Sequence, residues 1–308
     1  MIGSIKRKTS SQSFRRSQVI FYISIVALPV VQFLIFYIGV NFNSILLSFE
    51  KYDIHTNTYS FNSFNNFLDV IRGFQTTQYL PAALANSATV YILGLCITMP
   101  LSILFSYYLH KKMFGAGIIK VVLFLPTMLS SLIVVVVFKY LADRALPQIL
   151  EDIFAIKVPG LISSTETALP TLLFFCVWSG FGTSILMYLG AMNATSQSLY
   201  EAAEIDGAGD FQEFIYITFP HVFPTLSVYL VSGVGGFFTN QMNLFSFYGP
   251  DAEYALYTLG YYMYRGIKSA SPGDYPYFAA MGLMMTAVAI PVTYLMRYLL
   301  NRFGPSTD

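Results

Sequence analysis

The chain has 308 residues, of which 55% are hydrophobic and only 11% are charged, and its mean hydropathy is +0.58. Soluble domains carry about 25% charged residues, so this composition, with a net charge of +1, excludes a soluble single-domain enzyme, a disordered chain and a nucleic-acid-binding protein. Both cysteines, Cys96 and Cys176, lie inside long apolar stretches, which excludes a disulfide framework.

In chain order, the predicted elements are six membrane-spanning helices, because a bilayer-crossing helix needs about 20 mostly apolar residues. We expect them at residues 19–40, 86–109, 118–138, 168–192, 222–247 and 277–299. The first is interpreted as a retained anchor, since its apolar run is longer than that of a signal peptide and no small-x-small cleavage site follows. Continuous hydrophobicity, without alternation, disfavours a β-barrel. The predicted fold class is an all-α polytopic membrane protein.

The distribution of Lys and Arg indicates the orientation. Basic residues gather at both ends of the chain and in the short 110–117 loop, so both termini are expected in the cytoplasm. Residues 193–221 lie on the same side by this count, yet they contain Asp and Glu and no Lys or Arg. The predicted organisation is a cytoplasmic N-terminal segment 1–18, a transmembrane domain 19–300 with extracellular loops 41–85, 139–167 and 248–276, and a cytoplasmic tail 301–308.

The six predicted spans contain no Asp or Glu. Ion-coupled transporters place ionisable groups near the membrane midplane, and intramembrane catalysis needs a general acid, a base or a metal ligand. The pattern therefore disfavours both functions. The fifth span ends in a cluster of amides, Asn240, Gln241 and Asn243, for which helix packing and binding of a neutral hydroxylated solute both stay open.

Residues 196–220 are predicted to form two short helices joined at a glycine. Ser198 followed three residues later by Glu201 has the spacing of a capping box, so a helix is expected to begin there. Gly207 is placed to end this helix, because glycine adopts the left-handed conformation at low cost.

A second short helix is expected to begin at Asp210, with Glu213 repeating the N-cap pattern, and Pro220 is expected to end it before the fifth span. On helix rules alone, an ordinary amphipathic loop is the alternative interpretation of this segment.

The same segment resembles the EAA loop of permease subunits of binding-protein-dependent ABC importers. That signature reads E-A-A, three residues, G, nine residues, I-x-L-P. The matching residues are Glu201, Ala202, Ala203, Gly207, Ile217 and Pro220, with Phe219 at the usual leucine position. The resemblance implies a type I ABC importer permease fold and a location in the bacterial cytoplasmic membrane.

Further stretches resemble the sugar-transporting branch of this family, and in particular the maltose-permease first subunit. They are Leu125-Pro126, Trp178-Ser-Gly-Phe-Gly, Tyr200 to Gly209, Gly249-Pro250 and Thr258-Leu-Gly-Tyr-Tyr-Met-Tyr. The last of these resembles a branch proposed for oligosaccharides. The resemblance thus implies import of a carbohydrate, with an oligosaccharide as the expected substrate.

In this family the loop is a coupling helix that seats in a cleft on a cytoplasmic ATPase. The residues expected to couple to the ATPase are Glu201, Ala202, Ala203, Asp206, Gly207, Ile217 and Pro220. This chain has no G-x-x-x-x-G-K-[ST] run, so it is not expected to be an enzyme or to hold a cofactor or metal. ATP and Mg²⁺ are expected in the partner ATPase.

The resemblance also implies a substrate site and partners. Family sugar sites use the fourth and fifth spans, where the corresponding residues are Trp178, Phe181, Thr183, Ser184, Phe238, Asn240, Gln241 and Asn243; packing is the alternative role for each. The expected partners are a second permease subunit, an ABC ATPase dimer and an extracellular solute-binding protein that docks on the three extracellular loops.

Three alternatives stay open. The same architecture could import amino acids, peptides or phosphate. An ion-coupled secondary transporter is disfavoured by the spans without acidic residues. An intramembrane enzyme would need paired catalytic residues at one depth, which Ser184 and His221 do not provide.

Overall fold

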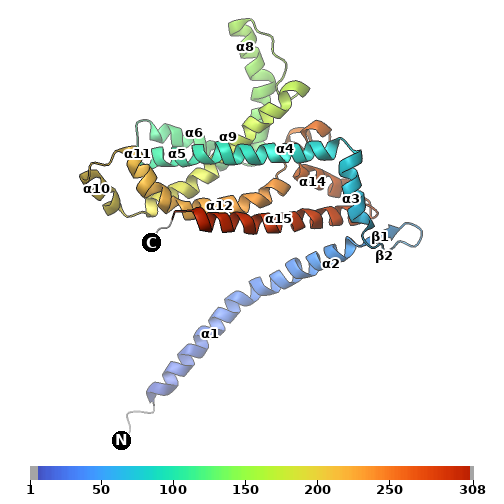
Figure 1. The fold of residues 1–308 in the computed structure, drawn as a ribbon, viewed down its shortest axis with the longest axis horizontal. Coiled ribbons are helices and arrows are strands. Elements are labelled where there is room, and N and C mark those ends of the chain that lie inside the picture. The colour runs from blue at the N-terminus through green and yellow to red at the C-terminus, as the bar shows by residue number, and fades with distance from the viewer. Residues whose placement is uncertain (1–5, 306–308) are drawn as a thin grey trace. The chain divides into compact units, whose positions relative to one another are not determined.

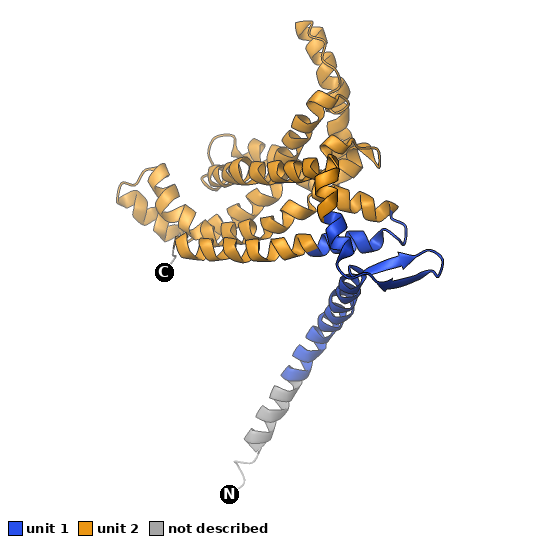
Figure 2. Cartoon of the chain, turned by 45° about the vertical axis from the view of Figure 1, so that its right-hand side comes forward, with its two compact units in different colours: residues 1–70, 270–283 blue, residues 71–269, 284–308 orange. Residues whose placement is uncertain are grey.

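The computed structural model describes the backbone of residues 6–305 and the side chains of residues 18–305. In this part the chain is helical apart from one hairpin and connecting loops (Figure 1). It divides into two compact units, shown in Figure 2: residues 1–70 with 270–283, and residues 71–269 with 284–308. Most of the predicted N-terminal segment 1–18 lies outside the residues whose side chains are described, and so does the end of the predicted tail.

Unit 1 begins with one long helical run and continues into a small hairpin. The run contains a candidate span over Gln18–Leu47, which confirms the first predicted span and extends it beyond residue 40. The two strands pair antiparallel, with Glu50 opposite Phe61. Asn66 fixes the hairpin to the helix that follows, since its Nδ2 donates to the carbonyls of Ser48 and Glu50, each at 2.8 Å. The elements are α1 (Lys6–Gln32), the π-helical η1 (Phe33–Gly39), α2 (Val40–Leu47), β1 (Glu50–Asp53), β2 (Thr58–Phe61) and α3 (Asn65–Thr76), which continues into unit 2.

Unit 2 contains the remaining helices. The first part comprises α4 (Tyr79–Leu93), η2 (Gly94–Thr98), α5 (Met99–His110), α6 (Ala116–Met128), α7 (Ser131–Tyr140), η3 (Leu141–Ala145), α8 (Leu146–Phe154) and α9 (Thr165–Ala194). The second part comprises α10 (Gln197–Ile205), α11 (Asp210–Glu213), η4 (Phe214–Thr218), α12 (Phe219–Thr239), α13 (Leu244–Tyr248), the 3₁₀ turn η5 (Tyr254–Leu256), α14 (Leu259–Ser269) and α15 (Tyr275–Phe303), whose first residues belong to unit 1.

Three of the π-helical segments, η2, η3 and η4, stand directly before prolines. Pro100, Pro147 and Pro220 each lie two residues after the last residue of such a segment. Proline lacks an N–H, and its ring clashes with the carbonyl four residues earlier in a regular α-helix. A widened π turn relieves this clash, so each helix continues through its proline. Pro220 therefore does not end a helix, contrary to the sequence-based expectation: the helix that begins at Asp210 runs through Pro220 to Thr239.

The third predicted span, 118–138, is broken. The helices Ala116–Met128 and Ser131–Phe154 meet at an angle of 110°. Between them, Leu129 and Ser130 have extended backbone angles, and the Ser130 hydroxyl accepts a hydrogen bond from Ile133 N at 3.4 Å. Ser130 thus caps a new helix, and the third predicted span, 118–138, is a bent pair of helices and not one continuous helix.

The fifth predicted span, 222–247, is also interrupted. The helix α12 ends at Thr239, and residues 240–243 form a non-helical turn before α13. Met242 and Asn243 have left-handed backbone angles. Gly260 of α14 packs against this turn so closely that a Cβ at Gly260 would lie 2.6 Å from Asn240 O. The break is thus held by a close backbone contact with α14.

The long helix α9 is central to the packing of unit 2. It contacts α4, α5, α6 and α12. One buried cluster joins it to α5 and α12 through Ile103, Tyr107, Tyr188, Met192, Val222 and Leu226. A second joins it to α5 and α6 through Leu109, Phe124, Phe181 and Ile185.

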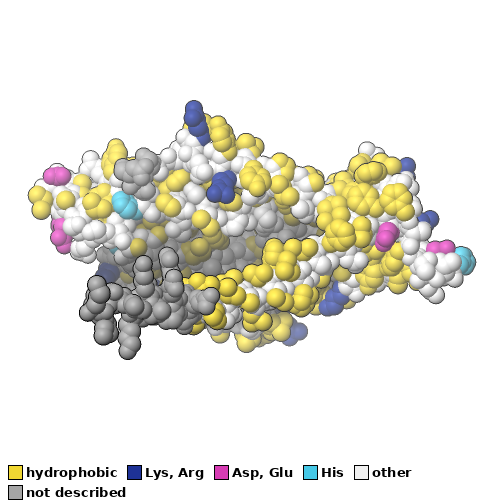
Figure 3. Space-filling model, turned by 90° about the horizontal axis from the view of Figure 1, so that it is seen from below, with side chains coloured by type: hydrophobic (Ala, Val, Ile, Leu, Met, Phe, Trp, Pro, Cys, Tyr) yellow, Lys and Arg dark blue, Asp and Glu magenta, His cyan; other side chains and the backbone are white. Residues whose placement is uncertain are grey.

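Apolar side chains also cover much of the outer surface (Figure 3). In the described residues, five helical runs are long and apolar enough to cross a membrane, and the bent pair makes up to six. A soluble protein would bury such helices, whereas lipid accepts them. This confirms the predicted class of multi-pass α-helical membrane protein.

Candidate functional site

The predicted coupling segment forms a helical elbow, which we define as residues 197–213. It consists of α10 and α11 and lies at one end of unit 2, at the left of Figure 1. Gly207 between them has φ +79°, a conformation that costs other residues about 1–2 kcal/mol. Ala208 N donates to Ala203 O at 2.9 Å and closes the end of α10. The expected turn at Gly207 is confirmed.

Both predicted helix starts in the elbow are wrong by one or two residues. The N-cap of α10 is Ser196, and Ser198 lies inside the helix with its hydroxyl 2.8 Å from that of Ser196. The N-cap of α11 is Gly209, whose N–H donates to Gln212 Oε1 at 3.1 Å. Because Gln212 satisfies this donor, Asp210 is the first helical residue and Glu213 is available for another role.

The outer surface of the elbow is acidic and apolar at once. Glu201, Ala202, Asp206 and Gly207 are exposed, and Ala203 is half-buried. Two large apolar side chains stand beside them: Ile205 is 86% exposed and Phe211 is 77% exposed. Of the other predicted coupling residues, Ile217 and Pro220 are half-buried in the helix that follows. The residues of the E-A-A-x-x-x-G part thus share an accessible surface, and the last two do not belong to it.

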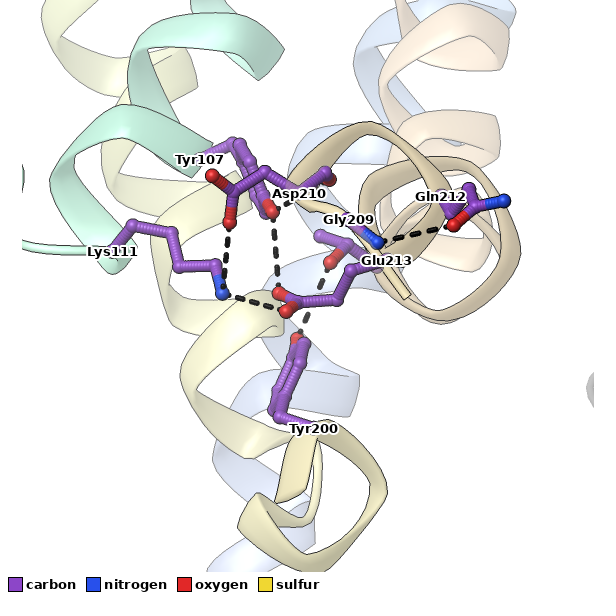
Figure 4. Close-up of polar contacts among 8 residues, drawn as sticks. Tyr107, Lys111, Tyr200, Gly209, Asp210, Gln212 and Glu213 are labelled. Carbon is purple, nitrogen blue, oxygen red and sulfur yellow. Dashed lines mark hydrogen bonds and ion pairs between the residues drawn. The ribbon is translucent and has the colours of Figure 1, made fainter. Parts of the chain in front are cut away.

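The inner side of the elbow is attached to the end of α5 by four residues, which we call the anchor cluster: Tyr107, Lys111, Asp210 and Glu213 (Figure 4). Lys111 Nζ lies 2.6 Å from Glu213 Oε2 and 3.5 Å from Asp210 Oδ1. Tyr107 Oη lies 2.9 Å from the Asp210 carbonyl oxygen and 3.2 Å from Glu213 Oε1, and can donate to either. The Glu213 side chain is only 8% exposed, so its charge depends on these two partners.

The charge of Lys111 is stabilised by the same contacts. Burial lowers the pKa of the Lys111 ammonium, but the hydrogen bond and charge of Glu213, together with Asp210, outweigh burial and leave this pKa above its ordinary value. Sequence reasoning missed the anchor cluster, because Lys111 and Glu213 are far apart in the chain. One signal was available in the sequence: Glu213 lies four residues before Ile217, so on a helix the two share a face, and the apolar Ile217 indicates that this face is partly buried.

A second contact joins the elbow to α5 and α9. The ring of Tyr200 in α10 lies 5.3 Å from that of His110, and His110 Nδ1 lies 2.9 Å from Asn193 Oδ1. Tyr200 Oη is 3.5 Å from Thr218 Oγ1 (Figure 4). The elbow is therefore supported on both of its helices while its outer surface stays open.

A cavity of about 220 Å³ lies among α4, η2, α5, α9 and α12. The polar residues in its wall include Tyr91, Tyr229 and Asn240. Tyr229 Oη accepts a hydrogen bond from Ser184 Oγ at 2.9 Å, whereas the buried Tyr91 Oη has no hydrogen-bond partner among the described residues. The cavity is lined by Ser87, Val90, Tyr91, Leu93, Gly94, Leu95, Thr98, Met99, Leu173, Cys176, Val177, Gly180, Tyr229, Leu230, Gly233, Gly236 and Asn240.

Of the eight residues predicted to contact substrate, the structure places only Asn240 in the wall of this cavity. Trp178 stacks on Phe138 with ring centroids 5.9 Å apart, and Phe181 is buried in the cluster of α5, α6 and α9. Ser184 is buried and reaches the cavity only through Tyr229. Packing thus accounts for these three side chains.

The other predicted contacts are outside the cavity wall as well. Thr183 is exposed on α9, and Phe238 packs edge-on against Phe237 at 4.8 Å. Gln241 and Asn243 belong to the turn after α12, where the Gln241 carbonyl accepts from Leu244 N. Even Asn240 serves this turn, because its Oδ1 accepts from Met242 N at 2.8 Å. The Asn240 amide therefore stabilises the break in the helix, and of these three residues Asn240 also lines the cavity.

Sequence reasoning missed Tyr91, Tyr229 and the glycines Gly180, Gly233 and Gly236 as cavity residues. Gly180 was noted only within the Trp178-Ser-Gly-Phe-Gly stretch, and Gly233 and Gly236 carry no side chain that would indicate a cavity. Tyr91 gave no signal, since a tyrosine in an apolar span is common near membrane interfaces. The side chains that line the cavity come from five elements, and only their packing shows which ones converge.

Comparison with known proteins identifies the family. Residues 99–305 match the family described as "Binding-protein-dependent transport system inner membrane component". The arabinooligosaccharides transport system permease protein AraP of Halalkalibacterium halodurans is 27% identical over 227 residues, which cover 72% of this chain and 71% of that protein. AraP of Bacillus subtilis is 25% identical over 281 residues, covering 89% and 86%.

Other relatives and a solved structure agree with this assignment. The maltose/maltodextrin permease protein MalF of Yersinia pestis is 33% identical over 142 residues, covering 44% of this chain and 27% of MalF. A chain in the crystal structure of a bacterial ABC transporter for import of the acidic polysaccharide alginate shares the fold, with TM-score 0.76 and 20% identity over 95% of this chain and 99% of that chain. This chain belongs to the family of inner membrane components of binding-protein-dependent transport systems, as the resemblance of its EAA segment predicted.

Proposed function

We propose that this chain is a permease subunit of an ATP-driven, binding-protein-dependent importer and that it forms half of the translocation path for an oligosaccharide. Family membership supports the transport role. The names of the AraP and MalF relatives and the alginate transporter support a carbohydrate substrate. The expected partners are a second permease subunit, a cytoplasmic ABC ATPase dimer and an extracellular solute-binding protein.

The observation that most supports coupling is the continuity between elbow and cavity. The helix that begins at Asp210 in the elbow continues as α12, without interruption, to Thr239. Tyr229, Gly233 and Gly236 on that helix line the cavity. A displacement of the elbow by a partner would therefore shift the cavity wall. Coupling to an ATPase requires such a link, because each state of the ATPase must favour a different arrangement of the membrane helices.

The surface of the elbow fits this role. Its acidic residues Glu201, Glu204 and Asp206 are complementary to a basic cleft, and Ile205 and Phe211 provide exposed apolar area at the same place. An exposed apolar surface beside a charged one is typical of a docking site. We assign the elbow to the ATPase contact and, with six spans, expect the elbow and both chain termini in the cytoplasm. ATP and Mg²⁺ would be bound by that partner.

The cavity has groups suited to a sugar. Sugars bind through hydrogen bonds to hydroxyls and amides and through contact of the ring faces with aromatic side chains. Tyr91, Tyr229 and Asn240, together with Ser87 and Thr98, provide such groups in a mostly apolar wall. The Tyr91 hydroxyl is buried without a partner, which costs free energy. We propose that it reaches the substrate when the cavity wall shifts, and we place Tyr91 first among the substrate contacts.

Coexpression with the partner ATPase and second permease tests the proposal. Loaded binding protein should stimulate ATP hydrolysis by the wild-type complex, and Gly207→Asp should abolish stimulation while the chain stays inserted. Gly209→Asp is the matched control: it adds the same charge two residues away, at a backbone with φ −79° that aspartate accepts readily. Full stimulation of the Gly207→Asp complex would contradict the coupling role.

The alternatives predict other outcomes. Uptake by this chain alone in vesicles, driven by an ion gradient and independent of ATP, would identify a secondary transporter. A copurifying binding protein that binds amino acids, peptides or phosphate in a ligand screen, and no sugar, would keep the architecture and change the substrate.

A further inference from the structure

A second hollow, of about 600 Å³, is separate from the cavity described above, and His110 is one of its lining residues. It is bounded by the end of α5, the connection to α6, the first turns of α6 and part of α9. We call it the basic pocket. It is lined by Leu109, His110, Lys112, Met113, Phe114, Gly115, Ala116, Gly117, Lys120, Leu189 and Asn193.

The charges of this pocket have one sign. Lys112 and Lys120 line it, and no Asp or Glu is among the lining residues. Neither lysine forms an ion pair with a described residue, whereas the neighbouring Lys111 is fully engaged by Glu213 and Asp210. Lys120 Nζ instead lies 6.0 Å from the centroid of the Phe124 ring. Two uncompensated cations beside one hollow favour an anionic ligand.

The pocket also contains the N-terminus of α6, which begins at Ala116 after Gly115 with φ +75°. The N–H groups of Ala116 and Ile118 already donate to the carbonyls of Met113 and Gly115, so what this end of α6 adds to the pocket is the positive end of the helix dipole. The helix dipole therefore adds positive potential to that of the Lys112 and Lys120 ammonium groups, and such a potential attracts phosphate oxygens.

The surroundings indicate that the anion has an apolar part. Phe114 at the rim is 99% exposed, Ile118 is 74% exposed and Val121 is 60% exposed. Ile118 and Val121 continue along α6, so an apolar strip leads away from the basic groups. The pocket also stands where the candidate span Tyr79–His110 ends and the bent pair begins, the depth at which lipid headgroups lie.

We propose that the basic pocket binds the phosphate headgroup of an anionic phospholipid, with an acyl chain along the exposed strip of α6. The phosphate would contact Lys112 and Lys120 beside the positive end of the α6 dipole. The acidic elbow offers the opposite polarity, so a protein partner complementary to the elbow would not also fit this pocket. The proposal rests on the proposed function in one respect only, the choice of membrane leaflet. If the elbow contacts an ATPase, the lipid lies in the cytoplasmic leaflet.

Native mass spectrometry of the chain, purified with the partners that copurify with it, tests the proposal. Phosphatidylglycerol and phosphatidylcholine are titrated separately, and retained lipid is counted. We expect preferential retention of phosphatidylglycerol, and about a tenfold weaker apparent affinity for it in Lys112→Gln/Lys120→Gln. The matched control, Lys51→Gln/Lys157→Gln, removes the same charge from other loops and should retain wild-type affinity. Equal retention in all three proteins would overturn the proposal.

Further arms separate the other ligands and guard against misfolding. A photoactivatable phosphatidylglycerol should label residues 109–121 of the wild-type chain; labelling confined to other segments would overturn the site. Inorganic phosphate at millimolar concentration should not displace the lipid, and displacement would indicate a soluble anion site instead. Lys112→Arg/Lys120→Arg should keep the affinity. Loss of a partner protein from Lys112→Gln/Lys120→Gln, with phosphatidylglycerol retained, would assign the pocket to that protein.

Discussion

The elbow and the cavity lie in the same unit, yet the chain builds them in opposite ways. The elbow is one continuous segment whose acidic side chains, apart from that of Glu213, are exposed. Two contacts attach it to α5 and the residue that follows, from Glu213 to Lys111 and from Tyr200 to His110. The cavity is assembled from residues of five elements, in parts of the chain that are far apart. The difference shows that a docking surface needs local geometry and a rigid attachment, whereas a binding cavity needs long-range packing. The helix from Asp210 to Thr239 is the element common to both.

The largest effect is expected from breaking the attachment of the elbow. Lys111→Met leaves the buried Glu213 carboxylate without its cation, a loss of about 3 kcal/mol for a buried charge whose partner is removed. The elbow should then detach, and stimulation of the ATPase by binding protein should fall by at least tenfold. Protection of the elbow from limited proteolysis measures the detachment directly.

A double variant sharpens this test. Lys111→Met/Glu213→Leu removes both charges and should recover most of the protection, because an apolar pair of similar volume replaces the ion pair. Lys157→Met is the control, since Lys157 is 86% exposed and 3.5 Å from an exposed carboxylate of Glu151 and should contribute little. If the double variant were as labile as Lys111→Met alone, the anchor cluster would not act as an ion pair.

The next effect tests the break that lies at the cavity end of α12. Gly260→Ala drives a Cβ against the backbone of Thr239 and Asn240, which should cost about 1–3 kcal/mol by overpacking. The melting temperature of the complex and the uptake rate should both fall. Gly235→Ala is the control, because nothing stands within 4 Å of its added Cβ and alanine favours the helix. An undiminished melting temperature in Gly260→Ala would show that the turn is not held by this contact.

A smaller and more specific effect is expected from the cavity hydroxyl. Tyr91→Phe removes the unpartnered Oη and should raise KM for uptake about two- to tenfold, the value of one hydrogen bond, while the folding stability should not fall, because the buried Oη has no partner to lose. Tyr188→Phe is matched, since Tyr188 Oη is also buried without a partner but does not line the cavity. Equal KM values for Tyr91→Phe and wild type would remove Tyr91 from the substrate site.

These experiments also separate what the sequence could and could not predict. The turn at Gly207 follows from residue type and spacing within one segment, so it was predictable. The start of α11 was not, because Gln212 accepts a hydrogen bond from Gly209 N–H and so makes Gly209 the N-cap, one residue before Asp210. The breaks in the third and fifth spans were missed because hydropathy measures how apolar a segment is and contains no information on where its helix bends or ends. Asn240 was identified as polar, but only the fold shows that its amide serves both a turn and a cavity.

The smallest expected effect is on the pH dependence of ATPase stimulation, which should be absent in wild type and present in Lys111→His. Since the pKa of Lys111 is raised above its ordinary value, the stabilisation it gives is complete below the unfolded-state pKa of about 10.4 and is lost only as the pH rises through the folded-state value. The ratio of stimulated to basal ATP hydrolysis should therefore show no step from Lys111 between about pH 6 and 8. In Lys111→His, whose unfolded pKa is about 6.5, the imidazolium beside Glu213 should be charged at pH 6 and largely neutral at pH 8, so the stimulation relative to wild type should fall across that interval. A constant ratio between the variant and wild type would mean that the elbow is held by the shape of the contact and not by the charge at residue 111.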